Sequence, residues 1–193
     1  AISMTTGFKG GLSSRTGFLI NEERELPENQ KDSLERVVIP YYKAIVAWLE
    51  NISLGMLGGE LYEIIDKTLP KASYHWQLNP GHFVADEEWM SSSLSKNSQR
   101  QIASGMIFQI DIIPSVAGYT GVSAEECVAI ADQSLQNELK VKYPELWERI
   151  TSRRNYIINE LKIDLSPDVL PLSNTVGYLR PFLLEKNKAL KVK

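Results

Sequence analysis

Three side chains that can bind a metal ion lie far apart in the sequence, each beside or within an apolar, strand-like run: His82, Asp111 and Glu125. One imidazole and two carboxylates on neighbouring strands could converge on a single ion, and such sets commonly hold divalent cations. Spacing alone does not establish a site, because no two of the three lie within one helical turn. The alternative is that His82 and Asp111 are hydrogen-bonded framework residues and that Glu125 lies on a solvated strand edge.

A second group of acids follows the histidine, and it contains Glu87 and Glu88 next to Trp89. Either glutamate could act with His82 as a general acid or base if burial raised its pKa towards neutrality. The simpler interpretation is that both are ordinary loop carboxylates. His82, Glu87 and Glu88 are therefore the candidate catalytic residues.

Composition narrows the class of protein. A chain of 193 residues with 43% hydrophobic and 23% charged residues suits one globular domain. Its net charge of −3 offers no basic surface, so we expect no nucleic-acid partner. No apolar stretch approaches the roughly 20 residues that span a bilayer, so we expect no membrane partner. The single cysteine, Cys127, lies in an apolar run; we expect it to be buried and inert, in a cytoplasmic protein.

The apolar periodicity predicts the elements that must position these residues. Strands are expected over residues 2–8, 12–20, 74–78, 106–113, 128–130 and 176–184. Helices are expected from Pro27 to about Asn51 with a kink at Pro40, over residues 61–69, from an N-cap at Asp132 to Leu139, and from Pro144 to about Leu161. Arg153 and Arg154 are expected on the solvated face of the last helix.

A strand pair followed by two helices occurs near the start of the chain and again after Met106. This weak duplication predicts an α+β domain, with a curved antiparallel sheet and helices covering its outer face. The chain begins at Ala1 without an initiator methionine. We therefore expect residues 1–193 to be the C-terminal part of a longer protein.

Four segments, in order, resemble the catalytic domain of the pita-bread superfamily, which includes methionine aminopeptidase, aminopeptidase P, prolidase and creatinase. The resemblance covers nearly the whole chain and is closest to the Xaa-Pro peptidase branch. It implies the pita-bread fold, with a pseudo-two-fold αβ repeat. The segments are Gly7-Phe8 through Ser14-Arg15-Thr16, Gly81-His82, Ser104-Gly105-Met106 through Asp111, and Glu125-Glu126 with residues 128–131.

The resemblance implies a ligand set and also shows departures from it. Active members hold two divalent ions with two Asp, one His and two Glu, and His82, Asp111 and Glu125 match the histidine and the two glutamates. Asp111 is one methylene shorter than the glutamate it replaces. One ligand Asp would fall in residues 11–13, which contain no carboxylate, and the other at or before Ala1. The second catalytic histidine of the family would fall in residues 86–88, which are all acidic.

Three functions follow as hypotheses. The first is an Xaa-Pro-peptidase-like domain with a lost or reduced dinuclear centre, which binds one Mn, Zn or Co ion weakly, or none. The second is an active metallopeptidase that cleaves Xaa-Pro bonds in short peptides or small amide-like substrates. The third is a non-catalytic binding module, and a homodimer is expected because proteins of this superfamily often pair through this domain. Exposed aromatic side chains would anchor such contacts, and the candidates are Trp48, Trp89 and Trp147.

Overall fold

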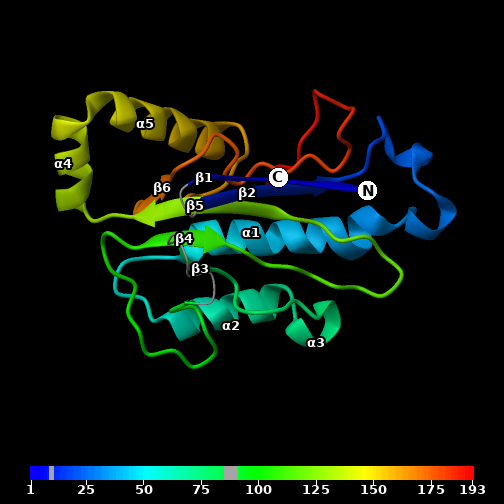
Figure 1. The fold of residues 1–193 in the computed structure, drawn as a ribbon, viewed down its shortest axis with the longest axis horizontal. Helices are drawn as coiled ribbons and strands as arrows, with labels where there is room; N and C mark the ends of the chain where they lie inside the picture. The colour runs from blue at the N-terminus through cyan, green and yellow to red at the C-terminus, as the bar shows by residue number, and fades with distance from the viewer. Residues whose placement is uncertain (9–10, 85–90) are drawn as a thin grey trace.

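The fold is built on an antiparallel sheet, seen in a computed structural model that describes residues 1–8, 11–84 and 91–193. The sheet has six strands in these residues, in the order β1-β2-β5-β4-β3, and β6 lies beside β5 (Figure 1). All neighbouring strands run antiparallel. The strands are β1 (Ile2–Phe8), β2 (Gly11–Gly17), β3 (His82–Phe83), β4 (Ile107–Ile110), β5 (Ala124–Ile130) and β6 (Val169–Pro171).

β5 is the central strand, and its burial alternates strictly along the chain. Ala124, Glu126, Val128 and Ile130 are buried, whereas the residues between them are half-buried. One edge of β5 pairs with β4. The other edge pairs with β2 at its start and with β6 at its end, so β2 and β6 share a single edge.

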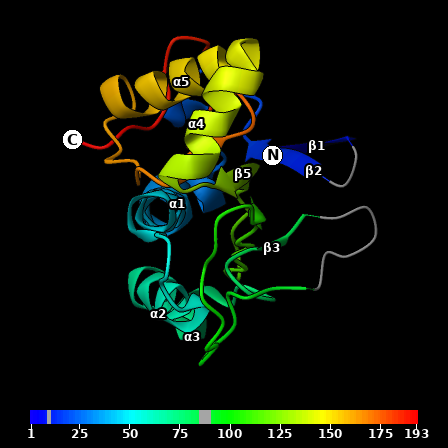
Figure 2. The same ribbon diagram turned by 90° about the vertical axis from the view of Figure 1, so that its left-hand side faces the viewer.

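The helices cover one face of this sheet and one of its ends. Side chains of α1 and α2 form a continuous core with Phe108, Val128 and Ile130 of the sheet, and both helices lie on the same side of it (Figure 2). α4 and α5 pack on a smaller cluster around Ile150 and Leu170. The helices are α1 (Ile39–Asn51), α2 (Gly58–Thr68), α3 (Lys71–Tyr74), α4 (Gln133–Lys142) and α5 (Pro144–Asn159). None of the helices in the described residues is both long and apolar enough to cross a membrane.

Several predicted elements are confirmed. β1 and β2 form a hairpin in which Met4 lies opposite Arg15. The Asp132 carboxylate accepts a 2.8 Å hydrogen bond from the Leu135 amide and so caps α4. Pro144 begins α5, where its missing N–H costs no helical hydrogen bond.

The first long helix differs from the prediction. Residues 34–38 form a π-helical turn, and the α-helix itself begins at Ile39. Pro40 therefore lies in the first turn of α1, where proline is tolerated, and does not kink a helix interior. The early apolar positions belong to this irregular lead into α1.

Two predicted strands are wrong, and two strands, β3 and β6, are missed. Residues 71–74 form α3, and the positive φ angles of His75 and Leu78 (47° and 56°) break the extended run expected over residues 74–78. Residues 176–184 form turns with one bridge between Phe18 and Phe182. The strand that does occur in this part of the chain is β6, whose three residues are too few to show an alternating pattern.

The arginines of α5 also differ from the prediction of a solvated face. Arg153 and Arg154 are half-buried, and their guanidinium groups donate to carbonyl oxygens of Pro171 (3.3 Å) and Ser166 (3.0 Å) respectively. The two side chains thus bind carbonyl oxygens at the end of β6 and in the turn before it. They fasten α5 to the end of the sheet.

Candidate functional site

The register of the sheet brings the three predicted ligands to one face. His82 of β3 lies opposite Gln109 of β4, which lies opposite Cys127 of β5. Paired residues share a face and alternate residues return to it, so Asp111 and Glu125 lie on the same side as these three. Continuing the register of β4 and β5 by one step sets Asp111 opposite Glu125. We call the surface formed by His82, Gln109, Asp111, Glu125 and Cys127 the site face.

The His82 ring is held in one orientation beside Asp111. Its Nδ1 lies 2.8 Å from the carbonyl oxygen of Phe83, and because a carbonyl only accepts, Nδ1 carries the proton. In the neutral ring this leaves the lone pair on Nε2, which lies 3.8 Å from Asp111 Oδ2. That separation is too long for a hydrogen bond, and it leaves both atoms able to share a third partner.

The two carboxyl groups of the site face are partly buried and lie close to each other. The pKa of Glu125 is raised to about 7. Burial is the main cause and the nearby Asp111 carboxylate adds to it, whereas Arg15 opposes the rise. Burial likewise raises the pKa of Asp111, and His82 opposes it. Asp111 Oδ1 is buried and has no hydrogen-bond partner among the described residues. The paired acids therefore retain protons at a higher pH than ordinary carboxylic acids do.

Among the described residues, the side chains around His82 do not fit a dinuclear metal centre. β1 and β2 contain no Asp or Glu, so no carboxylate of this hairpin faces His82, Asp111 and Glu125. Within residues 1–8, 11–84 and 91–193, no three His, Cys, Asp or Glu side chains converge as ligands of one ion. Two atoms of the site face could bind a cation: His82 Nε2 and the unpartnered Oδ1 of Asp111. The Glu125 carboxylate lies near them.

Glu126, adjacent to Glu125 on β5, points to the opposite face and has a different environment. Its side chain is 1% exposed, and Oε1 forms a 2.7 Å ion pair with Arg15 Nη2. The hydroxyl groups of Ser13, Ser173 and Thr175 also donate to its carboxylate. Sequence analysis missed this cluster, because only the pairing of β2 with β5 brings Arg15 beside Glu126 and supplies the partner that a buried carboxylate needs.

Arg15 also holds the site face in place from behind. Its guanidinium group donates to the carbonyl oxygens of Glu125 (3.0 Å) and Tyr178 (2.9 Å). The first bond fixes the backbone that carries the Glu125 carboxylate. The second fastens the segment after β6 to the same point of the sheet.

Cys127 is half-buried and lies on the site face, contrary to the prediction of a buried thiol among apolar side chains. Its thiol donates to Gln109 Oε1 at 2.8 Å, and the same oxygen accepts from the Leu12 amide at 3.2 Å. Burial raises the pKa of the thiol, which keeps it protonated and supports the prediction that it is inert. Gln109 thus links β2 to β4 across β5.

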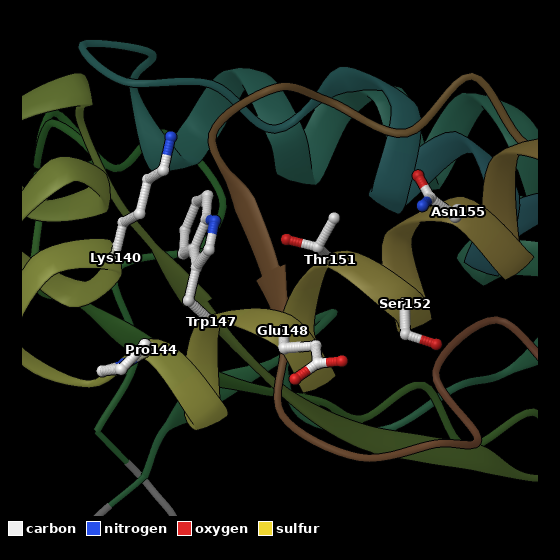
Figure 3. A pocket seen from close by; sticks show the side chains of 7 residues that line it. All are labelled: Lys140, Pro144, Trp147, Glu148, Thr151, Ser152 and Asn155. Carbon is white, nitrogen blue, oxygen red and sulfur yellow. The ribbon is translucent and has the colours of Figure 1, made fainter.

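Two surface hollows are relevant to the choice of site. One, of about 500 Å³, opens beside Cys127 between the β1–β2 hairpin, Ile107 and Leu172. The other, of about 600 Å³, lies on α4 and α5 around Trp147 and Lys140, and its walls are the largely exposed outer side chains of the two helices (Figure 3). Only the first adjoins the site face.

Five further residues were predicted to be catalytic or to contact a partner, and none of them is seen on the site face. Glu87, Glu88 and Trp89 lie outside the described residues. Trp48 is 0% exposed and packs against Phe108, so the prediction that it anchors a partner is wrong. Trp147 is half-buried against the small cluster of α5, and the homodimer stays a prediction.

Comparisons with known proteins find similarity only in structure. No family model and no curated protein matches the sequence. An Xaa-Pro dipeptidase from Bacillus anthracis is 19% identical, with a TM-score of 0.53, over 68% of this chain and 36% of that one. An X-Pro aminopeptidase from Thermotoga maritima is 17% identical, with a TM-score of 0.52, over 68% of this chain and 36% of that one.

A prolidase from Thermococcus sibiricus is similar at 17% identity and a TM-score of 0.53, over 68% of this chain and 35% of that one. The matched region is thus about a third of the length of each of these structures. At such identities the likeness establishes a shared fold.

Proposed function

We propose that this chain, whose fold is the pita-bread fold of the Xaa-Pro peptidases, keeps a peptide-binding cleft but lacks the dinuclear metal chemistry of hydrolysis. The observation that carries the proposal is the β1–β2 hairpin, which presents no carboxylate to the site face. A dinuclear centre works by activating a bridging water between two ions. Without bridging carboxylates, too little negative charge is present to hold two cations together.

A single divalent ion is the most that this donor set would hold. His82 Nε2, Asp111 Oδ1 and the Glu125 carboxylate would be its ligands, and Mn, Zn or Co would supply Lewis acidity when bound. Binding would be weak because the three side chains do not converge as placed and because the paired acids would first have to lose their protons. The hydrogen bond between His82 Nδ1 and the Phe83 carbonyl oxygen favours this role, since it orients the ring with Nε2 towards Asp111.

The ligand of the cleft is proposed to be a short peptide or a small amide-like molecule. The hollow beside Cys127 supports this, because it adjoins the site face and is lined by both apolar and hydroxyl side chains. Gln109 Nε2 carries two N–H groups; its interaction with the Glu125 carboxylate lowers the pKa of that group, and the second N–H can donate to a carbonyl group of the ligand. We propose that the chain binds such a ligand and that it hydrolyses the ligand poorly or not at all.

The test is an assay of Xaa-Pro dipeptide hydrolysis with added Mn, Zn or Co. We expect no turnover above that of a His82→Ala variant prepared in the same way. Matched preparations of His75→Ala, the only other histidine and an exposed one, control for the loss of an imidazole. Metal-dependent turnover that His82→Ala abolishes and His75→Ala retains would overturn the proposal in favour of an active metallopeptidase.

A further inference from the structure

A third hollow, more apolar than the two described above, lies away from the site face, between α1 and residues 190–193. It has a volume of about 570 Å³. The walls that matter are Tyr42, Val46 and Ala47 of α1 and Leu190 and Val192 of the terminal segment. No residue of the site face lines it, so anything that binds here is independent of the proposed peptidase-like site.

The terminal wall of this hollow is fixed by hydrogen bonds. The Leu190 amide donates to the Leu179 carbonyl oxygen at 2.9 Å, and the Val192 amide donates to the Leu161 carbonyl oxygen at 2.9 Å. The Tyr42 hydroxyl lies 3.1 Å from the Leu190 carbonyl oxygen, to which it can donate. The segment is therefore positioned by partners in three other parts of the fold, which keeps the hollow open.

The rim of the hollow is positively charged. Lys43, Lys191 and Lys193 line it, all three are exposed, and none forms an ion pair or hydrogen bond with another described residue. Glu50 is the one acid in the lining, and its carboxylate accepts from the Asp164 amide at 3.1 Å. Three lysines against one carboxylate leave the mouth with an excess of positive charge, and an apolar interior behind such a mouth is complementary to an anion that carries an apolar chain.

We propose that this hollow binds an amphipathic organic anion, with its apolar chain between α1 and the terminal segment and its anionic head at the lysines. A long-chain carboxylate is the simplest member of this class. Burial of the chain would supply most of the affinity, since apolar contact scales with the area removed from water. The lysines would supply the preference for a negative head group.

The experiment measures binding of a fluorescent long-chain carboxylate to the full chain, below the concentration at which it aggregates. Unlabelled competitors of one chain length carry a carboxylate, a hydroxyl or a trimethylammonium head. We expect the carboxylate to compete at least about tenfold better than the cation, which corresponds to one decade in Kd. Equal competition by all three, or no saturable binding of the probe, would overturn the proposal.

Variants separate the two parts of the site. Ala47→Trp, at a half-buried position, is expected to fill the hollow and abolish binding, whereas Lys43→Glu and Lys191→Glu should each weaken it several-fold. Lys67→Glu, at an exposed position of α2, makes the same charge change elsewhere and should have no effect. His82→Ala should also leave binding unchanged, so failure of this proposal is distinguishable from failure of the proposed function. Unaltered binding in Ala47→Trp would overturn the assignment to this hollow.

Discussion

Glu126→Ala is expected to lower the free energy of unfolding by about 3–5 kcal/mol, because it leaves a paired, buried charge without its partner. Glu126 accepts from Arg15 and from the hydroxyl groups of Ser13, Ser173 and Thr175, and its side chain is 1% exposed. Removing the carboxylate strands the guanidinium, whose own side chain is 18% exposed, and three hydroxyl donors. It also removes the two side-chain contacts, from Ser173 and Thr175, by which the segment after β6 meets this carboxylate.

Urea denaturation at neutral pH measures this effect as a shift of the midpoint at constant slope. Glu125→Gln is the matched control, since it removes the adjacent carboxylate from the same strand but on the other face. A loss below about 1 kcal/mol in Glu126→Ala, the size of an exposed pair, would show that the buried cluster does not stabilise the fold.

Glu125→Gln should have the opposite sign and should flatten the pH dependence of stability. The folded protein raises the pKa of Glu125 from 4.5 to about 7. The native state therefore binds more protons than the unfolded state between these values, and stability falls as the pH rises through this window. The full shift would be worth about 3 kcal/mol, and solvent screening of this half-buried group reduces it to about 1–2 kcal/mol.

The measurement is the free energy of unfolding of both proteins at several pH values from about 5 to about 8. Wild type should lose stability across this range, while Glu125→Gln should change less and be the more stable protein at the alkaline end. Parallel curves for the two proteins would contradict a raised pKa of Glu125 in the folded protein.

The pattern of the chain predicted the fold class and the ligand candidates, because both depend on local signals. The order of the four segments pointed to the pita-bread fold, which the structural comparison confirms. The capping of α4 by Asp132 is read directly from the residue type. The sequence placed Asp111 within a predicted strand and His82 beside one, and in the structure His82 Nε2 lies 3.8 Å from Asp111 Oδ2.

What could not be predicted depends on long-range contacts. Glu125 and Glu126 are chemically identical in sequence, and only the pairing of β5 decides which one meets Arg15 and which one meets Asp111. Trp48 was predicted to be an exposed anchor for a partner. In the structure it is part of the core that α1 forms with the sheet and α2. β6 is three residues long, and its position depends on its pairing with β5 and on contacts with the arginines of α5, which the sequence pattern does not show.

The most direct test of the central claim is the number of divalent ions bound per chain, measured by mass spectrometry after equilibration with Mn, Zn or Co. The absence of hairpin carboxylates predicts no more than one ion per wild-type chain, retained in His75→Ala and lost in His82→Ala. Two ions per chain, both lost in His82→Ala, would mean that a dinuclear centre exists. That result would contradict the account.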